Sequence, residues 1–420
     1  MRKQLLGAIV ATALFVLIGA LCAVFLVDPG RPGERGVLSG DGPGKPGMRQ
    51  VPSVRSVSVP LAGRLTRGAD GGSSTRTMQV ERFSQVAVVW RGPRVPRTDV
   101  RIRHAGRWSA WQPLEPLEDL EAGEGNGTKG SDLLWAGPSD AIRVRTRGPV
   151  PRDLELVLID PDGPAEQVRG EGIALAAYVA DPTTTPSPVA ASTSASTTTA
   201  PAAAAYPLTS PPPFNPPSHY APRPTIYGRK IWGANETWRN DIPYYSDTLV
   251  QAHLHHTASA NSYTRAAVPG IIRGMYSYHT RTLGWADIGY NFLVDRFGRI
   301  WQGRAGGIKH PVRGAHTLGF NNRSVGVAVI GNHETARPTT YAVTSVIRLI
   351  TWKLEIHRRR PASYTYATSE GSDRFAAGRV VRLPVIDGHR DTNQTACPGG
   401  YLYARLPEIR RRAQLRADAF

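Results

Sequence analysis

A low-complexity segment divides the chain, and it constrains the fold more than any other feature. Residues 181–225 consist largely of Ala, Pro, Ser and Thr, with unbroken runs at 183–185 and 211–213. Such a composition cannot bury a hydrophobic core and forms a disordered linker, extended and semi-rigid where prolines cluster. The 420 residues therefore predict folded parts on both sides of this linker.

The N-terminus predicts export. Arg2 and Lys3 precede a charge-free, mostly apolar run from Leu5 to Val27, which is long enough to cross a bilayer as a helix of about 20 residues. We expect residues 1–27 to be a signal peptide or a retained anchor, and both stay open because the cleavage signal near Cys22 is weak. Either way the protein is expected outside the cytoplasm, secreted or membrane-anchored, acting in the cell wall. Residues 28–54 are rich in Gly and Pro and predict a flexible tether.

The charge balance predicts an anionic partner. The formal net charge is +18, from 51 Lys and Arg against 33 Asp and Glu. Nucleic acid is the usual partner of so basic a chain, but export disfavours it, as does the absence of interleaved aromatic and basic motifs. We therefore expect no nucleic acid. For an exported protein the available polyanions are anionic wall polymers, lipid head groups and peptidoglycan carboxylates.

Residues 55–180 predict an all-β domain. Short stretches at 83–90, 100–103, 141–145 and 154–159 are apolar or alternate with a period of two, and turn signals separate them. This pattern favours a small antiparallel sandwich. Its role stays open between a spacer and a ligand-binding domain. Trp108 and Trp111 could stack on sugars, although large aromatics in a sandwich are more often buried.

Residues 226–420 predict one α/β domain. The apolar run 325–330 indicates a central strand buried on both faces, and 295–298 indicates a hairpin turn. Helical spacing of apolar residues occurs at 268–279, 343–354 and 402–409. The fold class expected for this part is therefore a central mixed β-sheet packed by helices, preceded by the sandwich-like domain and the linker.

Two histidines and a cysteine in this domain form a metal-ligand pattern. His389 and Cys397 lie on one loop bounded by Gly and Pro, and His255 ends a separate hydrophobic stretch. Imidazole and thiolate groups bind Zn²⁺, and three protein ligands leave a fourth position for water, as in catalytic zinc sites. Cys397 is also the one cysteine outside the apolar N-terminal run, and metal ligation is a good use for such a thiol. Taken singly, each residue could instead be a packing or turn residue.

Six sequence blocks in this domain occur in an order that resembles a known family. They are Trp232-Gly233-Ala234, 254–258, 284–294, 314–321, 325–332 and 388–399. Together they resemble the peptidoglycan recognition proteins, which have the type 2 N-acetylmuramoyl-L-alanine amidase fold. The resemblance covers the C-terminal half of the chain only.

The resemblance implies a zinc enzyme. It places the zinc ligands at His255, His389 and Cys397, and the catalytic residues at Tyr290 and Thr395. Members that bind peptidoglycan without cutting it typically replace the cysteine that stands here at Cys397. The implied reaction is hydrolysis of the amide bond between N-acetylmuramic acid and L-alanine. Tyr290 and Thr395 would hydrogen-bond the attacking water or the developing oxyanion.

Further residues are candidates for substrate binding. His316 lies in a Gly-flanked loop near the expected cleft, and bidentate pairing with stem-peptide carboxylates could involve Arg304, Arg313 and Arg390. Structural histidine and solvated arginines are the alternatives. The competing function is a non-catalytic peptidoglycan-binding module, against which the intact ligand set speaks. The bias toward Arg, Ala and Gly suggests an actinobacterial source.

Overall fold

The structure is a computed structural model that describes residues 53–68, 71–117, 125–163 and 208–420. The predicted signal or anchor at 1–27 and most of the tether and linker lie outside these ranges. Within them, no helix combines the length and the apolar character needed to cross a bilayer. The described residues belong to one compact unit, Gln50–Phe420.

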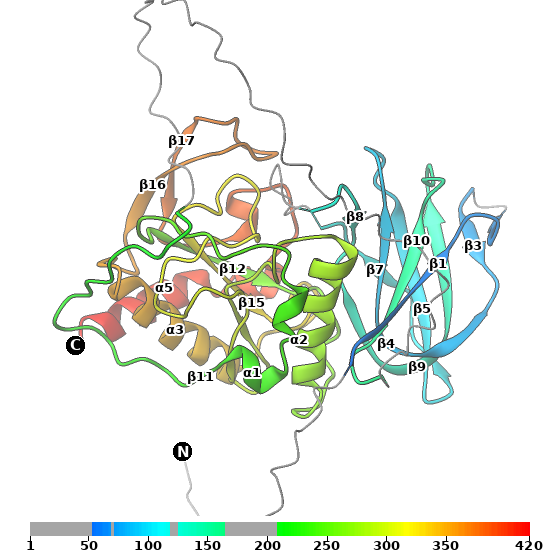
Figure 1. The fold of residues 1–420 in the computed structure, drawn as a ribbon, viewed down its shortest axis with the longest axis horizontal. Coiled ribbons are helices and arrows are strands. Elements are labelled where there is room, and N and C mark those ends of the chain that lie inside the picture. The colour runs from blue at the N-terminus through cyan, green and yellow to red at the C-terminus, as the bar shows by residue number, and fades with distance from the viewer. Residues whose placement is uncertain (1–52, 69–70, 118–124, 164–207) are drawn as a thin grey trace, which may run out of the picture. The chain divides into compact units, whose positions relative to one another are not determined.

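The N-terminal part of this unit is an antiparallel β domain, as predicted (Figure 1). Its strands run in the order β1-β10-β4-β9-β3-β2, and β5 pairs with β9 on one side and with β6 and β7 on the other, while β8 pairs with β4. Strands β4 and β9 are the longest and pair with each other. Strand β4 also pairs with β10, and β9 also pairs with β3 and β5. The bounds are β1 Arg55–Pro60, β2 Leu65–Arg67, β3 Ser73–Thr75, β4 Met78–Trp90, β5 Arg97–His104, β6 Arg107–Trp108, β7 Gln112–Leu114, β8 Lys129–Gly130, β9 Leu134–Arg147 and β10 Glu155–Asp160.

The alternation in sequence becomes an inside and an outside face. Val100, Ile102 and Val144 are buried, whereas the charged residues between them point outward. The turn between β5 and β6 places Ala105 and Gly106 at φ 48° and 74°, the left-handed conformation that tight hairpins require.

The C-terminal part is built on a six-stranded mixed sheet. The order is β11-β14-β13-β15-β12-β18, in which β13 and β14 are antiparallel and every other pair is parallel. This arrangement confirms the predicted fold class, including the hairpin at 295–298. The bounds are β11 Ile226–Tyr227, β12 Gln251–His256, β13 Phe292–Val294, β14 Ile300–Gln302, β15 Ser324–Val329 and β18 Ile386–Gly388.

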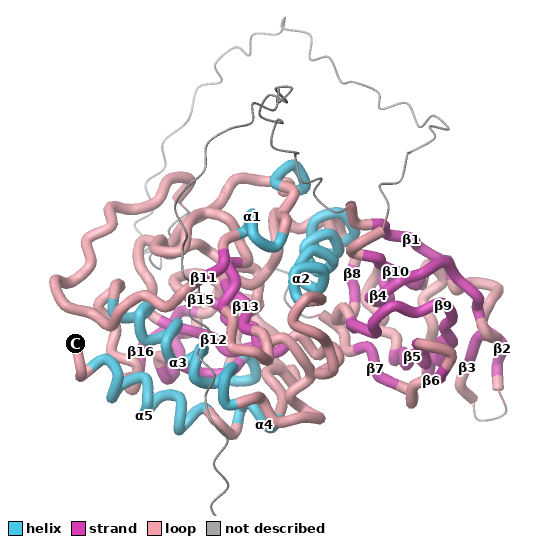
Figure 2. The backbone as a smooth tube through the Cα atoms, turned by 90° about the horizontal axis from the view of Figure 1, so that it is seen from below, coloured by secondary structure: helices cyan, strands magenta, loops and turns pink. Residues whose placement is uncertain are grey.

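Helices cover both faces of this sheet (Figure 2). Helix α2 (Val268–Ser277) packs on one face, and α3 (Thr340–Glu355) and α5 (Leu406–Ala417) pack on the other. The shorter helices are α1 (Arg229–Trp232) and α4 (Gly400–Tyr403), with single 3₁₀ turns at Glu236–Trp238 and His389–Asp391. Because both faces are covered, β15 is buried along its whole length, as its unbroken apolar sequence predicted.

Three local features differ from the sequence prediction. Helix α2 changes into a π turn at Tyr278–Thr282, so His279 belongs to the turn. Strands β16 (Tyr364–Thr368) and β17 (Val380–Pro384) form a hairpin that no clear pattern indicated. The described end of the predicted linker, 208–225, packs on the domain, because Leu208 pairs with Tyr245 and Ala221 is fully buried.

The β domain and α2 share a hydrophobic core. Tyr278 donates its hydroxyl proton to the carbonyl of Ser131 at 2.9 Å, and the Gln85 side-chain amide donates to the carbonyl of Ile271 at 3.2 Å. A Cβ on Gly274 would lie 1.6 Å from Oε1 of Gln85, so glycine is required for this close approach. The two domains therefore form one packed body.

Candidate metal centre

The predicted ligands lie where adjacent parallel strands end. Strand β12 lies between β15 and β18 and runs parallel to both. His255 is near the carboxyl end of β12, and His389 directly follows β18 at the start of the short helix His389–Asp391. Parallel neighbours end at the same sheet edge, where α/β proteins bind their ligands. Topology alone therefore brings the two histidines together.

Cys397 completes the cluster from the loop that follows. The amide of Arg390 donates to the Cys397 carbonyl at 3.0 Å, which folds the loop back onto its own beginning. The Cys397 sulfur lies 3.6 Å from Nδ1 of His255, and the His255 and His389 rings are 4.7 Å apart. Ligand atoms of all three residues lie within 4.8 Å of one another. Two imidazoles and a thiolate at this separation suit a tetrahedral zinc ion with one open position.

Burial keeps the His255 ring neutral. Its pKa is held well below the ordinary value, first by desolvation and then by the neighbouring His389 and His316. A neutral imidazole is the form that ligates a metal. The electrostatics therefore match the geometry of the cluster.

His316 lies directly behind His255. Its Nδ1 is 3.1 Å from Nε2 of His255, which leaves Nδ1 of His255 on the side of the cysteine. The His316 side chain is completely buried, and a Cβ on Gly314 or Gly326 would lie 2.2 or 2.4 Å from its ring. Because Gly326 sits on β15 beside His253 of β12, the sheet itself provides the space for this ring.

A buried carboxylate supports the same face of the sheet. Asp387 of β18 lies 2.6 Å from Nδ1 of His253 and accepts a hydrogen bond from the Gln251 side chain at 2.7 Å. All three residues are buried, and desolvation raises the pKa of Asp387. The His253 ring lies 5.8 Å from that of His316. Strand β12 thus presents two histidines to one face, one toward the metal cluster and one toward Asp387.

The cysteine loop is held by side chains around it. Arg390 donates to the carbonyls of Ala396 and Cys397, lies 3.6 Å from Glu334, and stacks on Tyr403. The loop between β16 and β17 adds Asp373, which accepts hydrogen bonds from Asn393 and from the amide of Gln394. The unpredicted hairpin therefore braces the loop that carries Cys397.

Both predicted catalytic residues are close to the cluster. Tyr290 is buried with its ring 5.4 Å from that of His255. Thr395 is half-buried and accepts a hydrogen bond from the Cys397 amide at 3.2 Å. It also lines an open depression of about 620 Å³, together with Arg374, Arg390 and other polar residues. The depression therefore adjoins the loop that carries Cys397, while His255, His389 and Cys397 are not among its lining residues.

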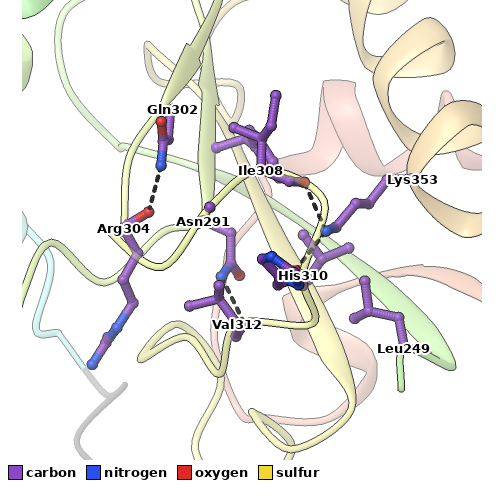
Figure 3. A pocket seen from close by; sticks show the side chains of 11 residues that line it. Leu249, Asn291, Gln302, Arg304, Ile308, His310, Val312 and Lys353 are labelled. Carbon is purple, nitrogen blue, oxygen red and sulfur yellow. Dashed lines mark hydrogen bonds between the residues drawn. The ribbon is translucent and has the colours of Figure 1, made fainter. Parts of the chain in front are cut away.

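The predicted substrate-binding residues are placed differently from one another. Arg304 is only 6% exposed and lines a small cavity that Lys353 and His310 also line. Its side chain extends away from those two residues (Figure 3). Arg313 pairs with Glu370 at 2.5 Å, and Arg390 holds the cysteine loop. His316 contacts the ligand His255 from behind. Contact with the substrate stays a prediction for Arg304, Arg313, Arg390 and His316.

Comparisons with known proteins agree with this geometry. Residues 248–400 match the Amidase_2 family, described as N-acetylmuramoyl-L-alanine amidase. Peptidoglycan-recognition protein SC2 of Drosophila simulans is 31% identical over 183 residues, 43% of this chain and 84% of that protein. The chain belongs to the peptidoglycan recognition protein family.

Further likenesses are to a human protein, a solved structure and a second family. Human N-acetylmuramoyl-L-alanine amidase is 33% identical over 187 residues, 44% of this chain but only 28% of the human protein. The solved structure titled Drosophila PGRP-LB wild-type is 26% identical, covers 43% of this chain and 92% of that one, and has a TM-score of 0.35. Residues 45–202 of this peptidoglycan recognition protein match a second family, Rv3811 N-terminal galactose-binding domain-like.

Sequence reasoning missed the residues that support the ligands. His253 and His255 stand two apart on a strand, and this spacing alone puts both on one face. Asp387 stands two before His389, and the parallel register pairs it with His253. Those two spacings could have identified His253 and Asp387 from the sequence. The contribution of the β16–β17 hairpin depends on contacts between distant segments, and no local pattern could reveal it.

Proposed function

We propose that the protein is a zinc-dependent N-acetylmuramoyl-L-alanine amidase. The observation that carries this proposal is the convergence of His255, His389 and Cys397, with ligand atoms within 4.8 Å of one another. The retained cysteine supports an enzyme over a recognition module, since a thiolate beside two imidazoles is a zinc ligand set with little other purpose. The amidase relatives support the choice of bond.

The chain's own residues account for binding and orientation. His255, His389 and Cys397 would hold the zinc ion, which lowers the pKa of a bound water toward about 7 and polarises the substrate carbonyl. Tyr290 and Thr395 lie at the cluster and would hydrogen-bond the attacking water or the developing oxyanion, each worth about 3 kcal/mol in the transition state. The open depression beside Thr395 would receive part of the muropeptide, and Arg390 at its edge could contact a stem carboxylate.

We also propose that the protein acts outside the cytoplasm. The apolar run at 5–27 supports a secreted or membrane-anchored protein that works in the cell wall, with peptidoglycan as its substrate. The basic charge supports additional contact with anionic wall polymers. The N-terminal segment would contact the membrane if it is retained.

The test is hydrolysis of isolated peptidoglycan followed by mass spectrometry of the released fragments. We expect intact stem peptides with a free L-alanine amine, released by the wild type and not after zinc removal, with activity restored by added zinc. Cys397→Ser should abolish release while wall binding persists. Arg348→Ala is the control, because Arg348 is exposed, and this variant should release stem peptides as the wild type does. Wall binding without release by the zinc-loaded wild type would favour the recognition module instead.

A further inference from the structure

One outward face of the β domain carries a dense row of arginines. On β5 and β9 every second residue points outward, and the apolar residues between them are buried. Along 97–103 and 143–147 the outward residues are all arginines except Asp99, and cross-strand pairing places the two rows side by side. The six arginines of this basic face are Arg97, Arg101, Arg103, Arg143, Arg145 and Arg147.

The six positive charges are only partly neutralised within the face. Arg97 lies directly opposite Arg147, and Arg101 lies directly opposite Arg143. Like charges at such positions destabilise a sheet. In the described part of the chain the acidic partners are Asp99 and Asp140, and Asp99 is shared between two arginines. An anion bound from outside would relieve the repulsion between the facing arginines.

Two tryptophans hold the guanidinium groups in place. Arg101 and Arg143 lie over the Trp108 ring at 5.9 and 5.1 Å, and Arg145 lies over Trp111 at 4.6 Å. A guanidinium stacked on a ring keeps N–H groups along its edge for hydrogen bonds with phosphate. Stacking also reduces the side-chain entropy that binding would otherwise cost. The half-buried tryptophans therefore act on the arginines rather than in the core.

We propose that the basic face binds a linear, phosphate-bearing polymer of the cell wall. Outward side chains recur about every 7 Å along a strand, so the arginines form rows that a chain of repeated phosphates can follow. A lipid surface fits less well, because the apolar side chains of β5 and β9 point inward and none is offered to acyl chains. The inference rests on the proposed location outside the cytoplasm and is independent of catalysis.

The test compares two charge-matched variants of residues 50–420, which form one compact unit. Arg97→Gln/Arg147→Gln removes a facing pair at the exposed end of the basic face, where Arg147 is 60% exposed. Arg348→Gln/Arg411→Gln removes two exposed arginines of the amidase domain. The probe is a purified polyol-phosphate teichoic acid. We expect roughly 20-fold weaker binding for the first variant, with a shallower salt dependence, and wild-type binding for the second.

Four results would overturn the proposal. They are equal losses in both variants, equal binding of an uncharged polysaccharide of similar length, tighter binding to vesicles of phosphatidylglycerol and phosphatidylcholine, and tighter binding to single-stranded RNA. Binding that appears only after the four acids of 118–124 are neutralised would instead make that acidic segment the occupant. Hydrolysis of a soluble muropeptide, measured on the same samples, should be equal in all variants. Absence of hydrolysis in every sample would refute the proposed amidase activity and leave the proposed polymer binding unaffected.

Discussion

His316 illustrates how one residue would act on the proposed zinc ion without touching it. If Nδ1 of His255 ligates the proposed zinc ion, its Nε2 would carry the proton, and Nδ1 of His316, 3.1 Å away, would accept the hydrogen bond. The two glycines that pack against His316 leave room for an imidazole and little else. The ring orientation of His255 therefore depends on a histidine whose own ring makes no other hydrogen bond within the described residues.

The first prediction concerns zinc affinity. His316→Leu removes the acceptor while keeping an apolar side chain of similar size, so zinc should bind about 10- to 100-fold more weakly. His316→Asn should restore much of the affinity, because its amide oxygen can accept the same hydrogen bond. Competition with a chromophoric chelator measures both. Equal affinity in the wild type and the leucine variant would refute the positioning role.

The second prediction separates catalysis from metal binding. Tyr290→Phe should lower kcat by about 100-fold while zinc content stays unchanged, because a donor to the transition state is lost and no ligand is. Tyr276→Phe is the matched control, since its hydroxyl donates to the Asn235 carbonyl on the α2 side of the domain. Steady-state hydrolysis of a muropeptide, with metal analysis, gives both values. Loss of zinc from Tyr290→Phe would contradict the assigned role.

At the scale of elements, the π turn after α2 links the interface to the Tyr290 loop. Tyr278 contacts the β domain, while the next residue, His279, accepts a hydrogen bond from the Gly289 amide at 3.1 Å and stacks on Trp285. Burial lowers the pKa of His279 from 6.5 to about 3. The turn thus places a neutral histidine directly under the loop that carries Tyr290.

The third prediction is a pH dependence of stability. Because the pKa of His279 is lower in the folded state, the unfolded chain takes up the proton first as the pH falls below about 6.5. Stability from this group is full above that pH and is lost toward pH 3, at about 1.4 kcal/mol per unit. Urea unfolding at pH 7 and 5 should therefore show a loss smaller by about 2 kcal/mol in His279→Asn. An identical loss in both proteins would refute this.

The elements that sequence could predict are those with a strong period. Strand β15, helix α3 and the hairpin at 295–298 follow from local patterns, as does the strand that delivers His255, whereas the short strand before His389 was not predicted. The π turn was missed because Tyr278 and His279 continue the helical spacing, and only tertiary contacts distinguish them. The β16–β17 hairpin was missed because its exposed face, with Tyr364 and Tyr366, does not follow a simple amphipathic pattern.

At the scale of the whole molecule, the shared core predicts one cooperative unfolding transition. Gly274→Ala should lower the free energy of unfolding by about 1–3 kcal/mol, because the added Cβ must displace the buried Gln85 side chain. Gly228→Ala is the control, since its nearest neighbour is 4.0 Å away. Calorimetry should give a single peak for the wild type. Two separate peaks would show that the domains fold independently.

The shared core also limits how this protein can change by exchange of modules. Helix α2 and the π turn after it contribute Ile271, Met275 and Tyr278 to the same cluster as Val89 and Val157 of the β domain. An amidase domain transplanted without its partner would carry that apolar surface into solvent, and a foreign β domain would lack the fitted contacts at Gly274. The pair is therefore expected to be inherited together, and relatives without the β domain should have a polar α2 surface instead.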